Sequence, residues 1–300
     1  MFVAFVDVLG FAAATTALSE DEELRLWDAF RMVRFDPQIR REGRPTNVLI
    51  NTYLTFREVV SELRQKLSLR DRNGSLQTIL FSDAIYLASP DIQDVVGGAS
   101  MIVGGLLSRG VPARAGIAMG EFITLNWTTN SDGIAKGTHF DAQFLGTGVV
   151  NSYYAESKGA RGIRVIVHPS ASSAIQEVFP DSLLWLDDEG NPDGRYEVNY
   201  PYFTFWPPMP LRGRDKIVHK VYGDYKRNLR SLRAAAPASL QPRYDLSLVA
   251  LRRMYAQSKE SMAPTYPFPY RFPFPYPNSE ADARYFAAPR GGTRKRRTRK

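Results

Sequence analysis

The chain has 300 residues with an ordinary globular composition, 44% hydrophobic and 23% charged, and it contains no cysteine, which excludes disulfides, thiolate metal sites and cysteine nucleophiles. Its three histidines do not lie at the spacing of zinc ligands, so a zinc site is not expected. No apolar run is long enough to span a membrane and the first residues lack the basic region of a signal peptide, so we expect a cytoplasmic protein.

The net charge of +8 is concentrated at the C-terminal end of the chain. Residues 290–300 contain seven basic residues and no acidic one, and 8 − 7 leaves +1 for the rest. A basic tail of this kind can bind nucleic acid or anionic lipid without sequence preference, but it is more often only solvated. Nucleic-acid binding by the tail is therefore the weaker interpretation.

The first predicted element is a buried strand over residues 3–6, which are apolar and rich in β-branched and aromatic types. Asp7 ends this run, and a carboxylate is costly to bury there unless a cation or several donors meet it. Gly10 then predicts a turn whose backbone N–H groups can approach a phosphate, before a helix over residues 11–18. Taken alone, Asp7 could equally cap that helix.

The later elements follow from the apolar spacing and the turn signals. In chain order they are helices over 19–34 and 48–69, a turn at 73–74, two strands within 76–89 that meet at Ser82–Asp83, a helix over 91–108, a strand over 112–119, a strand over 122–127 that hairpins back, a polar loop over 130–139, a helix over 142–157, a strand over 162–168, a helix over 170–180, an aromatic strand over 196–206, and helices over 214–233 and 240–257.

This order predicts an α+β fold with a mixed, mainly antiparallel sheet and helices packed on one face of it. We expect a catalytic domain over 1–168 and an extension of helices and strands packed on it over 169–258. Residues 259–300 are expected to form a disordered tail, whose segment 262–277 alternates proline with tyrosine and phenylalanine and is typical of an extended polyproline-type arm.

Two carboxylates carry the functional hypothesis. Asp7 ends the first strand and Asp83 lies at the turn between the second and third, so the two side chains would meet at one sheet edge if those strands are neighbours. Paired carboxylates beside a glycine turn and a helix N-terminus suit Mg²⁺ or Mn²⁺, which take oxygen ligands and share them with substrate phosphates. The alternative for Asp83 is an ordinary hairpin-turn residue.

Four motifs in order strengthen the metal-site hypothesis. They are Phe5–Phe11, Phe81–Ser82–Asp83, Arg114–Gly120, and Leu145–Val150 continuing to Glu156. In order and spacing the chain resembles the class III nucleotidyl cyclases, and most of all the pyrimidine (uridylate or cytidylate) cyclases of the Pycsar anti-phage system. The resemblance covers about residues 2–167 and implies the ferredoxin-like core of that superfamily.

By that resemblance, Asp7 and Asp83 would be the catalytic carboxylates and would hold two Mn²⁺ or Mg²⁺ ions together with the main-chain carbonyl of Val8. Backbone N–H groups at Gly10 and Phe11 would bind the triphosphate. The ribose 3′-hydroxyl would attack the α-phosphorus and pyrophosphate would leave. The resemblance also implies a homodimer with composite active sites, and a separate effector protein that the cyclic nucleotide activates.

The base-reading positions depart from those of purine cyclases. Ile79 and Gln143 stand where adenylate cyclases carry Lys and Asp, and guanylate cyclases Glu and Cys. The amide of Gln143 could bond a pyrimidine edge, which favours UTP, or else CTP, over ATP and GTP. Phe5 and Tyr53 are further candidate substrate-binding residues, although Tyr53 could instead be a packed surface aromatic.

The positions of the transition-state Asn and Arg also differ. They hold Val150 and Tyr154, and a shift of one residue would restore Asn but still leave Ala155 in place of the Arg. Arg114, which could contact substrate or the dimer partner, is one candidate for the replacement cation. Arg161 and Arg164 are the others. The alternative is a catalytically inactive cyclase-homology module that binds a nucleotide, and Glu156 is expected to form a structural ion pair.

Overall fold

The computed structural model describes residues 1–16, 18–19, 21, 48–68, 76–128, 140–158, 161–180, 183–185, 196–203 and 214–260. The chain divides into two units, Met1–Ser261 and Met262–Lys300, and every described residue belongs to the first. The turn at 73–74, the polar loop over 130–139 and the proline-rich arm lie outside the described residues, as does the helix over 19–34 apart from residues 19 and 21.

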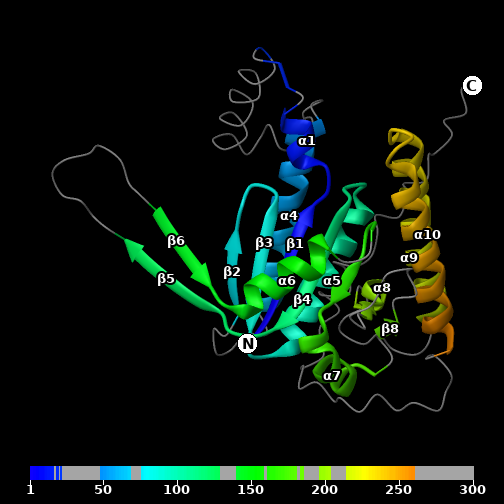
Figure 1. Ribbon diagram of the computed structural model, residues 1–300. Helices are drawn as coiled ribbons and strands as arrows, with labels where there is room; N and C mark the ends of the chain where they lie inside the picture. Colours follow the sequence, from blue (N-terminus) through cyan, green and yellow to red (C-terminus); the bar gives the residue numbers. More distant parts are fainter. Residues whose placement is uncertain are drawn as a thin grey trace, which may run out of the picture. The chain divides into compact units, whose positions relative to one another are not determined.

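A seven-stranded sheet forms the centre of this unit, and a two-stranded hairpin is separate from it (Figure 1). The order of the large sheet is β2 (Gln77–Leu80), β3 (Ala84–Ser89), β1 (Phe2–Val8), β4 (Ala113–Met119), β7 (Val165–Val167), β9 (Tyr196–Val198), β8 (Leu183–Trp185). Among the strands that the structure describes, only the β4–β7 pair is parallel. The predicted mixed, mainly antiparallel α+β fold is therefore confirmed.

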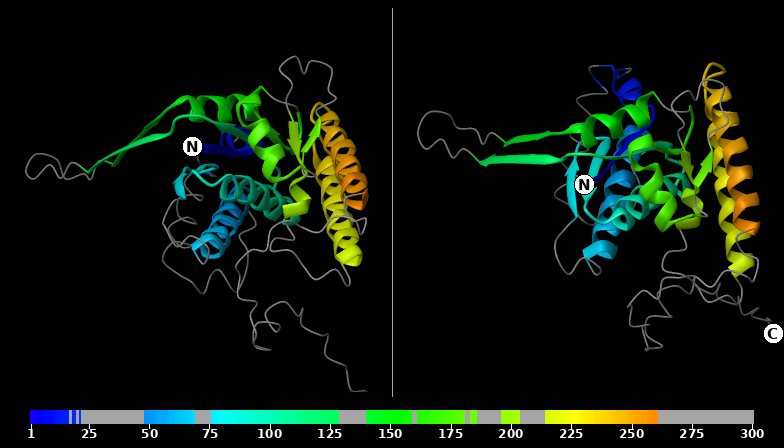
Figure 2. Two further views of the ribbon diagram at one scale, coloured as in Figure 1. Left: turned by 90° about the horizontal axis from the view of Figure 1, so that it is seen from below. Right: turned by 60° about the horizontal axis from the view of Figure 1, so that its bottom comes forward.

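Helices cover both faces of the sheet, so the prediction that they lie on one face is wrong. Helices α4 (Val48–Ser68) and α5 (Ile92–Ser108) lie on one side and α6 (Thr147–Ser157) on the other, as the left view of Figure 2 shows. The physical reason is visible in β1, where four consecutive residues, 3–6, are all buried. A continuous apolar run is typical of a strand with two covered faces, whereas a strand with one exposed face alternates.

The segment predicted as one helix over 142–157 is instead a strand followed by a helix. Strand β6 (Phe140–Leu145) alternates aromatic or small residues with polar ones, which is the period of a strand. Gly146 then adopts φ = +135° and α6 begins at the next residue. Strand β5 (Ile123–Thr128) pairs with β6 and not with β4, so the hairpin expected within 112–127 is also corrected.

The C-terminal part extends the sheet and then covers it with two long antiparallel helices. The predicted aromatic strand over 196–206 is shorter: β9 ends at Val198, a short helix α8 (Tyr200–Phe203) follows, and residues 204–206 lie outside the described part. Strand β8 was not predicted. Helices α7 (Pro169–Val178), α9 (Arg214–Ala235) and α10 (Gln241–Glu260) match their predicted ranges closely.

Hydrogen bonds fix α10 to the sheet. The Oγ of Ser247 accepts a bond of 2.8 Å from the backbone N–H of Ile163, just before β7. Farther along, Asn199 donates to the carbonyl of Met254 at 2.9 Å and accepts from the hydroxyl of Tyr222 on α9 at 2.7 Å. These side chains are buried, so the contacts satisfy polar groups that would be costly to leave without partners.

Candidate active site

Asp7 and Asp83 lie at the same end of the sheet, on neighbouring segments. Asp7 faces Ala84 of β3 on one side and Arg114 of β4 on the other. The backbone N–H of Val8 donates to the carbonyl of Asp83 at 2.9 Å. The residue after one carboxylate is thus bonded directly to the residue that bears the other, so the strands that carry them are neighbours, as the hypothesis requires.

The local sequence explains both positions. Phe81 and Ala84 close the β2–β3 turn through a backbone bond of 2.8 Å, and inside it the hydroxyl of Ser82 donates to Oδ1 of Asp83 at 2.9 Å. Helix α1 (Phe11–Thr16) begins after Gly10, whose φ is +83°. Asp7 lies inside β1 and not at the cap position of α1, so helix capping does not account for it.

The electrostatic surroundings of Asp7 are dominated by other carboxylates. Burial, and after it the negative charges of Glu156 and Asp83, raise its pKa from 3.8 to about 7, and the positive charge of Arg114 opposes this rise. Glu156 is buried on α6, and its pKa is also raised by burial and lowered by Arg114. Asp7 is therefore influenced by two other carboxylates and by one guanidinium, which is bonded to Glu156.

Arg114 is bonded to Glu156. Its Nε and Nη2 lie 2.7 and 2.5 Å from Oε1 of that carboxylate, and the two side chains are only 16% and 4% exposed. The expected ion pair of Glu156 is confirmed, but its place beside Asp7 was missed. The available signal was Arg114 itself, since an Arg in the middle of a central strand needs a partner.

This donor set fits a hard divalent cation. The desolvated carboxylates of Asp7 and Glu156 hold more negative charge than the one guanidinium of Arg114 compensates, and a cation bound by Asp7 and Asp83 would offset it. Across the described part of the chain, no cluster of three or more His, Asp or Glu side chains could hold an ion by itself. The remaining ligands would have to come from the Val8 carbonyl, water and substrate phosphates.

A group of aromatic rings lies on the α6 face of the sheet. Phe5 is 4.7 Å from Tyr86 and 5.7 Å from Tyr153, measured between ring centroids. Tyr86 also lies 5.0 Å from Phe144 of β6, and Phe81 at the hairpin turn is 5.9 Å from Phe144. Of these rings, only Phe5 was predicted as a site residue. Burial, Tyr153 and Glu156 raise the pKa of Tyr86 to about 12, so its hydroxyl keeps its proton at neutral pH.

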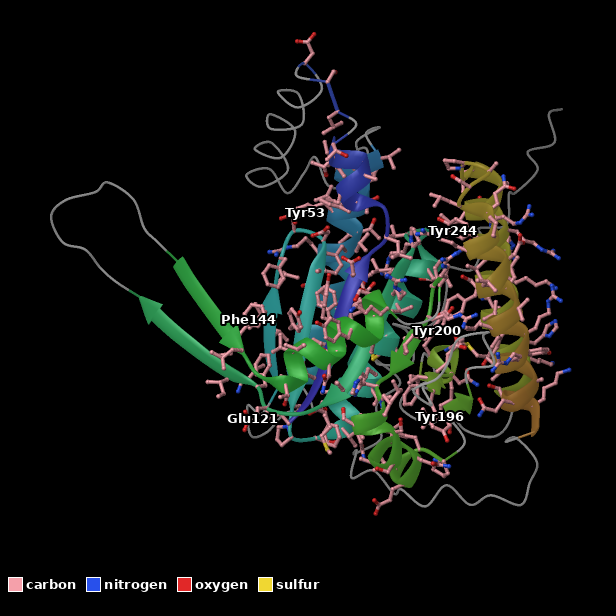
Figure 3. The ribbon with its side chains drawn as sticks, viewed as in Figure 1. Tyr53, Glu121, Phe144, Tyr196, Tyr200 and Tyr244 are labelled. Atoms are coloured by element: carbon pink, nitrogen blue, oxygen red, sulfur yellow. The ribbon has the colours of Figure 1, made fainter. Side chains whose placement is uncertain are left out.

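The other predicted substrate residues are more dispersed. Gly10 is exposed and Phe11 opens α1 beside it. Tyr53 lies on α4 near the α1 end of the unit (Figure 3), and α4 packs on α5 in the layer opposite α6. The guanidinium of Arg57 lies 6.0 Å from the Tyr53 ring. Gln143 occupies β6 opposite Leu125 of β5, in the separate hairpin.

The proposed replacement cations also differ in position. Arg164 is 1% exposed, and its Nε lies 3.8 Å from Oε1 of the buried Glu197. Arg161 is exposed in the segment before β7. Val150 and Tyr154, which stand where purine cyclases have Asn and Arg, are 48% and 41% exposed on α6. Arg114 is therefore the candidate cation that lies directly beside Asp7.

Comparison with known proteins finds similarity to solved structures. No protein-family model matches the chain, and no curated protein matches it. Among solved structures, the guanylyl cyclase Cya2 matches with a TM-score of 0.39 and 14% sequence identity, over 66% of this chain and 90% of that chain. A match at this level establishes neither an activity nor a substrate. None of the helices in the described residues is long and apolar enough to cross a membrane.

Proposed function

We propose that the protein is a divalent-cation-dependent nucleotidyl cyclase that converts UTP to 3′,5′-cyclic UMP and pyrophosphate. The observation that carries the proposal is the junction between β1 and the β2–β3 turn. There the Val8–Asp83 backbone bond brings the carboxylates of Asp7 and Asp83, the first of them largely desolvated, to one end of the sheet. The order of the four cyclase-like motifs supports the same assignment. The cyclic product would serve as a second messenger in anti-phage defence and activate a separate effector.

In this mechanism the chain positions the reactants. Asp7, Asp83 and the carbonyl of Val8 would hold Mn²⁺ or Mg²⁺, and the N–H groups at Gly10 and Phe11 would bind the triphosphate. The bound ions would supply positive charge that favours the 3′-alkoxide and neutralises the phosphates. A bond forms between the 3′-oxygen and the α-phosphorus, the bond to the bridging oxygen breaks, and pyrophosphate leaves as the hydroxyl proton goes to solvent.

Arg114 would have two tasks in such a site. Glu156 fixes its guanidinium beside Asp7, where it offsets part of the negative charge in the absence of an ion. An Arg has five N–H donors, so its bonds to one oxygen of Glu156 leave others for a phosphate oxygen. We assign it the transition-state charge that Tyr154 does not provide.

The pyrimidine assignment rests on the residues at the two base-reading positions, 79 and 143. Ile79 packs against the cluster that contains Phe5 and Tyr86, so this side offers an apolar surface where adenylate cyclases have a Lys. Stacking on aromatic rings is compatible with any base, and the selective contact would come from Gln143. CTP is the close alternative, because an amide can either donate or accept.

The test is product formation from each of the four nucleoside triphosphates with Mn²⁺, followed as pyrophosphate and as cyclic nucleotide. Asp7→Asn and Asp83→Asn should each lower the rate about 100-fold or more, because several kcal/mol of charge stabilisation is lost and each 1.36 kcal/mol is tenfold. Asp224→Asn, on the exposed face of α9, is the matched control and should leave the rate unchanged.

A second candidate is an inactive module that binds a nucleotide, favoured by Val150 and Tyr154 at the two positions named above. Turnover of none of the four substrates by the unmodified chain, together with saturable binding of one of them, would establish this alternative. Turnover that survives both Asp substitutions would rule out the proposed site while leaving an enzyme to be explained.

A further inference from the structure

The positive charge of this protein is not confined to its C-terminal tail. Residues 214–260, which contain α9 and α10, have eleven Lys and Arg against four Asp and Glu, a net +7. Residues 1–213 have nineteen basic and twenty-five acidic residues, a net −6. The chain before residue 290 is therefore nearly neutral only in total. Its two long helices carry a strong positive charge, and residues 1–213 carry a negative one.

On α9 the cations form one exposed stripe. Buried residues on this helix recur at helical spacing from Val218 to Leu229 and pack inward. The positions on the opposite side of the helix are exposed, and the basic ones are Lys216, Lys220, Arg227 and Arg230. Nitrogen-tipped side chains extend from the outer side of the two helices in Figure 3. Arg252 and Lys259 of α10 are exposed as well.

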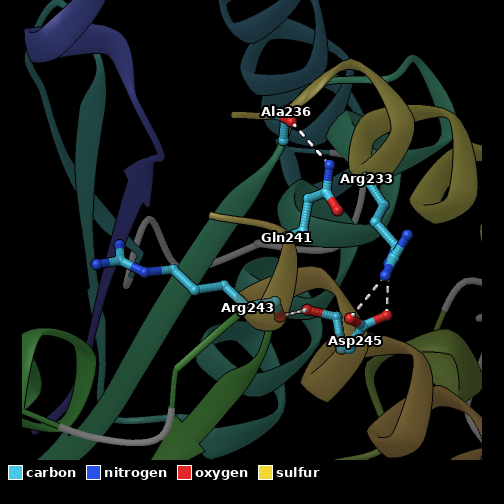
Figure 4. Close-up of polar contacts among 6 residues, drawn as sticks. Arg233, Ala236, Gln241, Arg243 and Asp245 are labelled. Carbon is cyan, nitrogen blue, oxygen red and sulfur yellow. Dashed lines mark hydrogen bonds and ion pairs between the residues drawn. The ribbon is translucent and has the colours of Figure 1, made fainter. Parts of the chain in front are cut away.

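Few acids compensate this stripe among the described residues. Asp224 lies 3.1 Å from Arg227, but both side chains are exposed, 39% and 76%, and exposed pairs of this kind contribute little. Asp245 is committed to Arg233, with bonds of 2.6 and 3.2 Å at the junction of α9 and α10 (Figure 4). The field over the stripe is therefore positive.

The stripe fits a polyphosphate backbone better than a membrane surface. A helix that lies in a bilayer interface inserts large apolar residues, whereas Gly223 and Ala234 share the exposed side of α9 with the cations. From Lys216 to Arg230 the helix rises about 21 Å at about 1.5 Å per residue, which is about six base pairs at about 3.4 Å each. We propose that the outer face of α9 and α10 binds the backbone of nucleic acid without sequence preference.

None of the basic residues of this surface belongs to the proposed catalytic residues. The two helices stand on the opposite side of the unit from the β5–β6 hairpin (Figure 1). Failure of the cyclase proposal would leave the nucleic-acid proposal intact, and the reverse also holds.

The test uses the full-length chain with the seven basic residues of 290–300 replaced by Gln, so that the tail cannot bind. Its affinity for a fluorescently labelled 20-base-pair duplex of arbitrary sequence is measured by anisotropy between 50 and 200 mM KCl. Adding Lys216→Gln, Lys220→Gln, Arg227→Gln and Arg230→Gln should lower the slope of log K against log salt by about 3.6, since each neutralised phosphate contributes about 0.9.

The control variant carries Arg57→Gln, Lys158→Gln and Arg161→Gln, which are exposed cations outside the two helices, and its slope should not change. An unchanged slope in the α9 variant would overturn the proposal. So would the absence of duplex binding by the tail-substituted chain at 50 mM salt, or binding only to vesicles that contain phosphatidylserine. Circular dichroism confirms that each variant is folded.

Discussion

At Asp7, the fold disfavours the ionised carboxylate that the proposed chemistry requires. It lies in a buried strand, beside two other carboxylates and one guanidinium, and its pKa is raised to about 7 from an ordinary value of 3.8. The ionised form of this side chain is therefore disfavoured in the folded protein when no cation is present. A divalent ion would convert that cost into binding energy, because it binds the ionised form.

We predict a specific dependence of stability on pH. Between about pH 4 and pH 7, the folded protein binds the Asp7 proton more tightly than the unfolded chain does. The contribution of Asp7 to the free energy of unfolding is therefore largest below pH 4 and falls as the pH rises through 7. In EDTA, the free energy of unfolding measured with urea should fall less between pH 5 and pH 7.5 in Asp7→Asn than in the unmodified chain. Equal losses in the two proteins would contradict the assignment. In the unmodified chain, Mn²⁺ should restore stability more at pH 7.5 than at pH 5.

At the same scale, the sequence could predict the two aspartates because each interrupts an apolar strand at a turn. It could not place Glu156 beside Asp7, since that contact depends on how α6 crosses β4. Arg114 lies in register with Asp7 across the sheet, and only the packed helix decides which carboxylate its guanidinium meets. Contacts between separate layers of a fold carry no periodic signal in the sequence.

Among the elements, α6 has the closest packing against the sheet. A Cβ added at Gly116 of β4 would meet the carbonyl oxygen of Ser152 and lie 2.5 Å from the backbone nitrogen of Glu156. The helix backbone therefore rests directly on the strand, and the distance between them sets where Glu156 reaches Arg114. The spacing of these two elements thus also sets the charge around Asp7.

Gly116→Ala should destabilise the protein by about 1–3 kcal/mol, because α6 must move away from the sheet to admit the methyl group. The same variant should lower product formation as Glu156 is displaced. Gly97→Ala in α5 is the control: nothing lies within 4 Å of the added Cβ, and removing a helical glycine should be neutral or stabilise by up to about 1 kcal/mol. Urea denaturation measures both, and similar losses in the two variants would contradict the packing argument.

A second prediction concerns the elements that continue the sheet beyond β7. Glu197 of β9 and Arg164 next to β7 are fully buried together, so Glu197→Ala leaves a buried guanidinium without this carboxylate and should cost about 3–5 kcal/mol. Asp224→Ala, which removes an exposed pair, should cost less than about 1 kcal/mol. Thermal unfolding measures the stability of both variants. A small loss of stability in Glu197→Ala would show that the buried pair does not stabilise the fold.

The elements that the sequence predicted well are long or bounded by strong turn signals, such as α4, α5, α9 and α10. Among the errors, the prediction of one helix over 142–157 merged β6 with α6, because the apolar residues on both sides of Gly146 can be fitted to a helix of continuous period. Three-residue strands such as β8 are too short for any period to appear. Strand β8 forms because it pairs with β9, and this tertiary contact cannot be read from its own three residues.

For the molecule as a whole, the distribution of exposed apolar residues bears on assembly. Phe81, Val150, Tyr153 and Tyr154 are each more than 40% exposed, and they come from the β2–β3 turn and from the outer side of α6. The rings of Tyr153 and Phe5 are in contact, so this surface adjoins the proposed site. A second copy of the chain that covers this surface would complete the composite active site of the proposed homodimer.

Val150→Glu should therefore weaken self-association at least about tenfold, a loss of about 1.4 kcal/mol, and make the specific activity depend on protein concentration. Val249→Glu is the matched control, since this Val is 46% exposed on α10, away from the site. Sedimentation velocity and activity are measured at the same concentrations. If the unmodified chain is monomeric at every concentration at which it is active, the composite site is excluded.

The backbone bond between Val8 and Asp83 has a further consequence for living cells. Because strand pairing and not the acids holds these positions together, a subunit that lacks both carboxylates would fold and find partners normally. Because both acids come from the same chain, a mixed pair of one intact and one altered subunit in the proposed homodimer would keep one carboxylate pair and therefore one working site of two.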